Sequence, residues 1–187
     1  MASPFSGQHS SLEEIQKYHF DSESALNCYY NFSNVCNIPE FIGYTKEEIN
    51  NELKSRKEWL DRMCSLEILV TIEARFRIDY SVRSKKKKKD NLSRAFRNIY
   101  KKKPDKASLK DDLIKTWKRI YLEHKTRLDD LERALDYRNW LAHGRYWTPT
   151  KKPHVLKYDY LGIYRLALDI LNDMNLREKT FKDFKKN

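Results

Sequence analysis

The chain has 187 residues, and its 38 Lys and Arg against 27 Asp and Glu give a formal net charge of +11. Only 4 residues are glycine, against an average share of about 7%, and neither G-x-G-x-x-G nor G-x-x-x-x-G-K-S/T occurs. These absences exclude proteins that hold a nucleotide or dinucleotide phosphate in a Gly-rich loop. With 40% hydrophobic and 35% charged residues, the chain is expected to be all-α with a packed core.

No segment predicts export or a membrane span. The stretch Met1–Ser11 lacks the basic start and apolar run of a signal peptide. No apolar run approaches the roughly 18 residues that cross a bilayer. Cys28, Cys36 and Cys64 form no C-x-x-C pair, so neither a disulfide framework nor a zinc site is expected. We therefore expect a cytoplasmic protein without a metal, a cofactor or a membrane partner.

Residues 1–43 are predicted to be an N-terminal appendage of uncertain order, because Ser, Asn, Gly and Pro surround its two short helical patterns, Glu13–His19 and Ser22–Phe32. A helical domain is expected over residues 44–187. It opens on Thr45-Lys-Glu-Glu48, a capping box that predicts a long helix to about Ser81. The lysine run that follows is expected to end this helix by charge repulsion.

Four further helices are predicted in chain order. Asp90 can cap a short helix over Asn91–Lys102. Ser108 with Asp111 begins another to about Lys125, and a third runs from about Leu128 to His143, with Gly144 as its C′ residue. Residues 145–158 are predicted to be a loop, Asp159 opens a last core helix to Met174, and the basic tail 177–187 is expected to fray. The predicted architecture is a bundle of four or five main helices.

The positive charge is concentrated in a basic loop and short helix, residues 83–106. This segment holds 12 Lys and Arg against 2 Asp and Glu, a net charge of +10, whereas residues 1–82 carry a net charge of −5. Such a density suits a polyanion such as RNA. The expected contacts are Lys85, Lys86, Lys87, Lys88 and Lys89. A solvated loop is the structural alternative, and a membrane-surface role lacks an accompanying apolar face.

The segment Asp136–Trp147 carries the strongest chemical pattern, because Arg138, Asn139 and His143 gather at the end of a predicted helix. Asn139 and His143 share a helix face. Arg138 and His143 lie about 140° apart, so they can reach one ligand only through the long Arg side chain or by unwinding near Gly144. A His that moves protons beside an Arg that neutralises phosphate oxygens suits metal-free phosphodiester chemistry. In the alternative interpretation these residues are structural: His143 caps the helix end, and Arg138 forms an ion pair.

The pattern Arg138-Asn139-x-x-x-His143 resembles the R-polar-x(3–5)-H motif of HEPN domains. These all-α domains occur in bacterial toxins, abortive-infection proteins and RNA-guided ribonucleases. The resemblance covers roughly residues 44–180, with a long helix before the motif and an amphipathic helix after it. It implies a metal-independent endoribonuclease in which the RNA 2′-OH attacks the adjacent phosphate, acting as a toxin or in phage defence.

The same resemblance implies the roles of individual residues and partners. Arg138 and His143 would be catalytic, Asn139 would orient them, and Arg145 and Tyr146 would contact phosphate or base. HEPN nucleases place two motifs face to face, so a homodimer with a composite active site is expected. An antitoxin or defence-system partner is also implied.

The chain departs from one branch of the family that it resembles, and the position of one further residue stays open. In one HEPN subfamily the motif is R-x4-H-x-Y, and its tyrosine is nucleotidylated by an antitoxin. Here Tyr146 stands one residue later, which argues against that regulation. Some HEPN nucleases also carry an acidic residue on an earlier helix, for which Glu67 and Glu73 are candidates, with an ion pair or a solvated position as the alternative. A catalytically silent HEPN module that binds RNA or nucleotide, or serves as a partner subunit, also stays open.

Overall fold

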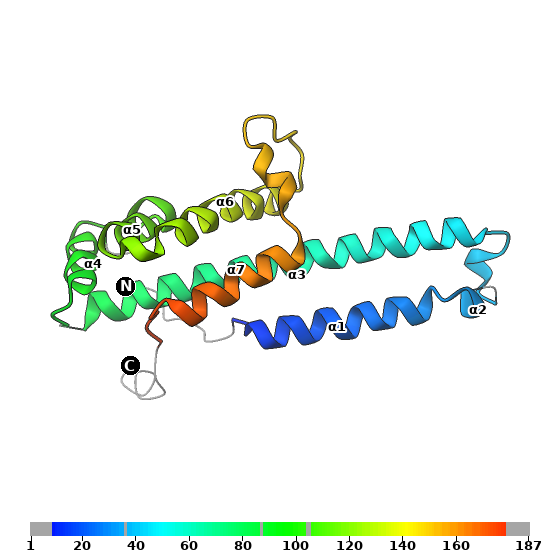
Figure 1. Cartoon of the computed structure of the whole chain (residues 1–187), viewed down its shortest axis with the longest axis horizontal. Coiled ribbons are helices and arrows are strands. Elements are labelled where there is room, and N and C mark those ends of the chain that lie inside the picture. The colour runs from blue at the N-terminus through cyan, green and yellow to red at the C-terminus, as the bar shows by residue number, and fades with distance from the viewer. Residues whose placement is uncertain (1–8, 36, 87, 104–105, 179–187) are drawn as a thin grey trace.

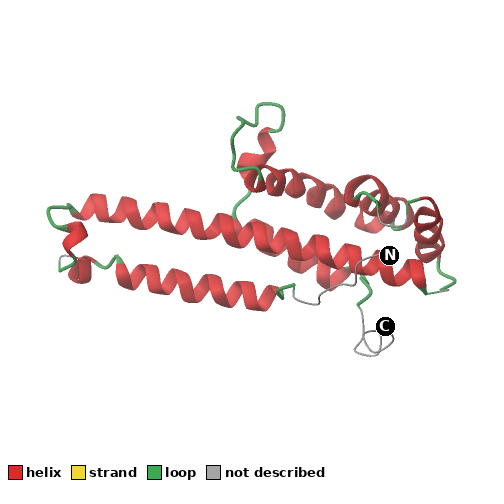
Figure 2. Ribbon diagram, turned by 180° about the vertical axis from the view of Figure 1, so that it is seen from behind, coloured by secondary structure: helices red, strands yellow, loops and turns green. Residues whose placement is uncertain are grey.

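The computed structural model describes residues 9–35, 37–86, 88–103 and 106–178. Over these ranges the regular elements are helices and no strand occurs, which confirms the predicted all-α class (Figures 1 and 2). The α-helices are α1 (Leu12–Tyr29), α2 (Phe32–Val35), α3 (Lys46–Lys85), α4 (Asn91–Lys102), α5 (Lys115–Ile120), α6 (Lys125–Ala142) and α7 (Tyr160–Asp173). Shorter turns are the 3-10 helices η1 (Pro39–Phe41), η3 (Leu122–His124) and η4 (Pro153–Lys157), and the π-helix η2 (Leu109–Ile114).

The 40-residue helix α3 is the axis of the fold, and the other long helices lie along it (Figure 1). It begins as predicted: the Thr45 hydroxyl accepts from the Glu48 amide at 3.2 Å, and the Glu48 carboxylate accepts from the Thr45 amide at 2.7 Å. Its end was predicted too early, because the helix continues past Ser81 to Lys85. The last turn holds because Arg83 is buried and bonded to Asp79 one turn before.

One core fills the space where α3 meets α4, α5, α6 and α7. Its largest fully buried side chains include Phe76 on α3, Phe96 on α4 and Trp117 on α5. Burial of each such side chain contributes about 1.5–3 kcal/mol to folding. The apolar faces of α6 and α7, which include Leu131 and Ile163, belong to the same core. The motif-bearing helix α6 is therefore held against the middle of α3.

The N-terminal segment forms one helix where the sequence predicted two short ones. Ser11 caps α1 through a capping box with Glu14, at 3.1 and 2.7 Å. The helix runs unbroken to Tyr29 and packs antiparallel to the first half of α3 (Figure 1). Leu12 and Ile15 lie in the same buried cluster as the core of α3. Leu12, Ile15 and the half-buried Leu26 pack against the core, and the polar stretch around Ser22 lies between them within the one helix.

The helix predicted from Ser108 to about Lys125 is broken in the structure. The amide of Leu113 bonds to the Ser108 carbonyl at 3.1 Å, which makes the first turns π-helical, and α5 then ends at Ile120. The chain then turns through η3 into α6, on which Glu132 pairs with Lys118 of α5 at 2.6 Å. This interaction between two helices is absent from any local sequence pattern.

The remaining boundaries lie close to the predictions. The short helix α4 spans the predicted Asn91–Lys102, and α7 follows its cap Asp159, whose carboxylate accepts from the Gly162 amide at 2.7 Å. α6 begins three residues before the predicted Leu128, at Lys125. The loop over residues 145–158 includes η4, and of the predicted tail 177–187 only residues 177–178 are described.

Candidate active site

The motif lies where α6 ends and the chain turns sharply. α6 ends at Ala142, and the His143 amide still bonds to the Asn139 carbonyl at 3.0 Å. Gly144 follows with φ +70°, as predicted for the C′ residue, and Arg145 is also left-handed with φ +57°. A left-handed conformation costs a non-glycine residue roughly 1–2 kcal/mol. The Arg145 amide bonds to the Trp140 carbonyl at 2.9 Å, which helps to hold this turn.

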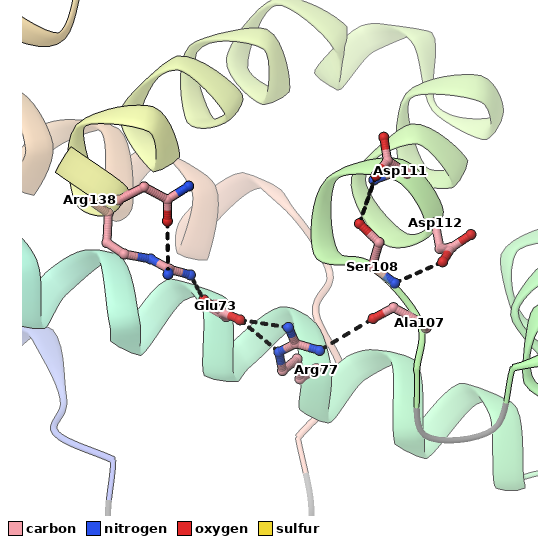
Figure 3. A network of polar contacts seen from close by, with 8 residues as sticks. Glu73, Arg77, Ala107, Ser108, Asp111, Asp112 and Arg138 are labelled. Atoms are coloured by element: carbon pink, nitrogen blue, oxygen red, sulfur yellow. Dashed lines mark hydrogen bonds and ion pairs between the residues drawn. The ribbon is translucent and has the colours of Figure 1, made fainter. Parts of the chain in front are cut away.

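The Arg138 guanidinium is held by two acceptors from different parts of the fold. One Nη donates to Glu73 on α3, and the other donates to the Asn139 Oδ1 at 3.0 Å. Glu73 also accepts from Arg77 Nε at 2.8 Å, so it links two guanidinium groups (Figure 3). Arg77 in turn reaches the carbonyl of Ala107 at 3.5 Å, before η2. Arg138 is thus fixed in direction by an acidic residue 65 positions earlier in the sequence.

The burial of Arg138 is partial. Its side chain is 24% exposed, and its Nε is buried without a hydrogen-bond partner among the described residues. Burial lowers the pKa of the Arg138 guanidinium from its ordinary value, but an arginine stays charged at neutral pH. A cation at the surface with part of its solvation removed interacts strongly with an incoming anion.

Arg138 and His143 do not meet within one chain. Arg138 turns toward α3, whereas His143 is exposed at the helix end, with its ring 6.2 Å from the Trp147 ring. Arg145 and Tyr146 are exposed too, and Tyr146 stands 83% exposed beside Trp147. The structure therefore brings Arg138, Asn139 and Glu73 together, and it leaves His143, Arg145 and Tyr146 open to solvent.

The lysine run lies apart from the motif. Lys85 ends α3, Lys86 caps it, Lys88 is half-buried and Lys89 is exposed, while Lys87 lies outside the described residues. Lys85 stands 12 residues beyond Glu73, which is about 18 Å along the helix axis. The run and the motif can contact one long ligand, but they do not form one pocket.

Of the two acidic candidates on α3, only Glu73 meets the motif. Glu67 is exposed and accepts from the Ser10 hydroxyl at 2.9 Å, on the side of α3 that faces α1. The sequence identified Glu73 as a candidate because an acidic residue on an earlier helix accompanies some related motifs. It could not decide between the two candidates, since both stand on the same predicted helix.

Sequence reasoning missed a second polar cluster beside the motif. Asp136 accepts from Lys110 Nζ at 2.6 Å and from Lys152 Nζ at 2.8 Å, and it contacts His154 Nε2 at 3.3 Å. Burial alone would raise the pKa of Asp136, but the bonds from the two lysines outweigh it and lower the pKa. An adjoining pocket of about 400 Å³ is lined partly by Asn139. The adjacent Lys151 and Lys152 in the predicted loop were the sequence feature that could have indicated this cluster.

The described ranges hold neither a metal cluster nor a membrane span. Among residues 9–35, 37–86, 88–103 and 106–178, no three His, Cys, Asp or Glu side chains are placed to share a metal ion. No helix in that part of the chain combines the length and apolar character needed to cross a bilayer. No protein-family model, curated protein or solved structure matches the chain.

Proposed function

We propose that this chain is a homodimeric, metal-independent endoribonuclease of the HEPN type, acting as a toxin or a phage-defence effector. The observation that carries the proposal is the placement of Arg138. Its guanidinium is directed by Glu73 and Asn139, stays partly exposed, and belongs to a residue five positions before the exposed His143. A fixed cation and a solvent-facing imidazole at one helix end supply the two kinds of group that RNA cleavage needs.

The reaction uses the nucleophile that RNA itself carries. A neutral His143 removes the proton from a ribose 2′-OH, and the 2′-oxygen attacks the adjacent phosphorus. The bond from phosphorus to the 5′-oxygen breaks, and a protonated imidazole donates the proton that this leaving oxygen needs. Arg138 neutralises the charge that develops on the non-bridging oxygens. The products are a 2′,3′-cyclic phosphate and a 5′-OH.

A second copy supplies what one chain lacks. The base and the acid are two imidazoles, whereas each motif has one His, and within one chain Arg138 and His143 point apart. A two-fold association presents both residues twice. The proposal therefore includes a composite active site, with an antitoxin or another defence protein as a partner that restrains it.

The test is cleavage of fluorescently labelled RNA in excess EDTA, with the product ends identified by mass spectrometry. We expect cleavage that continues in EDTA and leaves 2′,3′-cyclic phosphate and 5′-OH ends. A DNA oligonucleotide of the same sequence is the control, and it should stay intact because it lacks the 2′-OH. Cleavage of both oligonucleotides, or cleavage that EDTA stops, would contradict the proposal.

One observation favours a second candidate, a catalytically silent HEPN module that binds RNA or nucleotide or serves as a partner subunit. In the isolated chain Arg138 is already occupied by Glu73 and turned away from His143. RNA binding without cleavage by the wild-type dimer would support this second candidate. Membrane binding is not part of either proposal, and co-sedimentation with anionic vesicles tests that point directly.

Replacing Lys85, Lys86, Lys87, Lys88 and Lys89 by glutamine is expected to weaken RNA binding without changing base preference. Lysines that bind phosphates release counterions, so removing one such lysine should flatten the slope of log K against log salt by roughly 0.7 for a single strand. Fluorescence anisotropy over a range of salt concentrations measures this slope. The control is Lys46→Gln with Lys54→Gln, two exposed lysines at the opposite end of α3. An unchanged slope in the five-lysine variant would show that the run is a solvated loop.

A further inference from the structure

The pocket beside Asp136 touches both parts of the motif. Its volume is about 400 Å³, which is within the size range of small-molecule sites. Asn139 lines it and holds the Arg138 guanidinium through its Oδ1 at 3.0 Å. Trp147 lines it as well, and the centre of the Trp147 ring lies 6.2 Å from that of His143. A ligand in this pocket therefore contacts the immediate neighbours of both proposed catalytic residues.

The wall of this pocket is anchored to the core, although it belongs to a loop. Val155 lines the pocket and is 1% exposed within the main hydrophobic cluster. The Trp147 carbonyl accepts from Trp140 Nε1 at 3.0 Å, which ties the loop to α6. The Lys152 amide bonds to the Pro149 carbonyl at 3.1 Å, which closes a turn between them. The pocket is therefore formed before a ligand arrives.

The charge around the pocket is positive, because the Asp136 carboxylate is satisfied within the chain. One of its oxygens accepts from Lys110 and Lys152, and the other contacts His154. Lys151 also lines the pocket and is exposed. An ammonium group has three N–H donors, so Lys152 can donate to a ligand as well as to Asp136. The three lysines outweigh the single carboxylate, and the pocket therefore favours an anionic ligand.

The pocket also offers a flat ring and hydrogen-bond donors. The Trp147 side chain that lines it is half-buried. Because the Asn139 Oδ1 accepts from Arg138, the part of the Asn139 amide that is left to meet a ligand is its NH₂ donor. The exposed hydroxyls of Thr148 and Thr150 add further hydrogen-bonding groups. Aromatic side chains stack on every nucleobase and lysines bind phosphates, so these groups together match the chemistry of a nucleotide.

We propose that this pocket binds one nucleotide, with its base against Trp147 and its phosphate on Lys151 and Lys152. The bound unit is a nucleoside monophosphate, either one residue of an RNA chain or a free nucleotide. In a bound RNA this nucleotide neighbours the cleaved phosphate, so the pocket selects which phosphodiester bond is cut. The inference rests on the proposed function in that last respect, whereas binding of the nucleotide does not depend on cleavage.

The first test titrates the full chain with AMP, GMP, CMP and UMP by isothermal calorimetry, with ribose 5-phosphate as the ligand that lacks a base. We expect saturable binding of at least one mononucleotide and weaker binding of ribose 5-phosphate. Trp147→Ala should raise the dissociation constant by about 5- to 150-fold, the usual effect of losing a stacked base, whereas Trp147→Phe keeps an aromatic ring and should retain most of the affinity. Trp59→Ala is the matched control, because it removes an exposed tryptophan of α3 that does not line this pocket. Circular dichroism checks that the variants keep their helices.

A lysine substitution tests the phosphate part of the pocket. Lys151→Gln leaves the bonds from Lys110 and Lys152 to Asp136 in place, and it should weaken the binding of mononucleotides more than the binding of the corresponding nucleosides. Lys157→Gln is the control, since Lys157 is exposed at the end of η4 and does not line the pocket. The inference is overturned if no mononucleotide binds with a dissociation constant below about 10 mM. It is also overturned if Trp147→Ala and Lys151→Gln both leave the affinity unchanged, because the cluster then only fastens the loop to α6.

A second test distinguishes the two sources of the nucleotide with RNA oligonucleotides in which one abasic residue is moved along the sequence. If the pocket holds a residue of the RNA, the abasic residue should slow cleavage at one fixed distance from the cut, and Trp147→Ala should remove this dependence. Mononucleotides should then compete with labelled RNA in fluorescence anisotropy. A mononucleotide that binds together with RNA, without competing, identifies a free nucleotide as the occupant.

The pocket and the nuclease can fail separately in these tests. Mononucleotide binding that depends on Trp147 and Lys151, without any RNA cleavage, supports the pocket and rejects the nuclease. RNA cleavage with no mononucleotide binding and no effect of an abasic residue supports the nuclease and rejects the pocket. Cleavage whose position follows the abasic residue in the wild type, but not in Trp147→Ala, supports both.

Discussion

His143→Ala is expected to lower kcat for RNA cleavage by about 10²- to 10⁴-fold, the usual contribution of a positioned general acid or base. In a two-fold site the substitution removes both imidazoles, so neither the 2′-OH nor the leaving oxygen has a proton carrier. KM should change little, because binding depends on the basic surface and on Arg138. The measurement is the initial rate with fluorescent RNA at saturating and limiting concentrations.

The His143→Ala substitution should leave the fold intact. His143 is exposed, and its contribution to the end of α6 is made by its backbone amide, which alanine keeps. Circular dichroism and the dimer mass should therefore match the wild type. His9→Ala is the control, because it removes another exposed imidazole, near the N-terminus. If His143→Ala cleaves RNA at the wild-type rate, the proposed chemistry is wrong, whatever the binding data show.

Arg83→Met is expected to reduce the free energy of unfolding by about 3–5 kcal/mol, the usual cost of removing one partner from a buried ion pair. Arg83 is 3% exposed and Asp79 is fully buried, with Arg83 Nε 2.6 Å from an Asp79 carboxylate oxygen. Arg83 also donates to the Asn175 carbonyl at 2.8 Å and lies over the Trp117 ring at 5.5 Å. Methionine fills part of the volume but leaves the buried carboxylate without its counter-charge. Urea denaturation measures the change.

The pH dependence of this variant has a definite sign. Burial raises the pKa of Asp79 although Arg83 acts to lower it. A carboxyl whose pKa is higher in the folded state than in the unfolded state makes the folded protein less stable as the pH rises from the unfolded pKa to the folded pKa. This pH interval begins at about pH 4. Without Arg83 the folded pKa of Asp79 rises further, so this pH interval widens. The loss in free energy of unfolding caused by Arg83→Met should therefore be larger at pH 8 than near pH 4.

A second substitution separates charge from packing. Asp79→Asn in the Arg83→Met background should recover part of the stability, because a neutral amide costs less to bury than an unpaired carboxylate. Arg133→Met is the control: it removes an ion pair with Asp130 whose two side chains are about half exposed, and it should leave the urea midpoint unchanged. A deficit in Arg83→Met that neither depends on pH nor responds to Asp79→Asn would show that packing alone is involved.

The correctly predicted boundaries share a physical cause. Thr45 with Glu48, Asp90 with Ser93, and Asp159 with Gly162 each close a hydrogen bond across three residues. Such local bonds are visible in the sequence, because the two partners stand in one short window. The left-handed Gly144 belongs to the same group, since it ends α6 where a glycine is tolerated without strain.

The wrong boundaries depend on contacts between distant residues. α3 continues beyond Ser81 because Arg83 also donates to the carbonyl of Asn175, 92 residues later in the chain. α5 ends at Ile120, and its Lys118 pairs with Glu132 on α6, 14 residues later in the chain. No local pattern contains such pairs, so the sequence could indicate helix but could not say where the packed bundle permits it to end.

By itself the sequence determined the helical class, most helix starts and the chemical content of the segment Asp136–Trp147. The scarcity of glycine and the capping residues favour helix through interactions within a few residues, which do not depend on how the helices pack. Only the tertiary structure decided that Arg138 turns to Glu73 while His143 stays exposed, and that the hairpin of α1 and α3 leaves an apolar face uncovered. The physical reason is that side-chain direction and exposure depend on which helices share a core, and this depends on contacts between residues far apart in the chain.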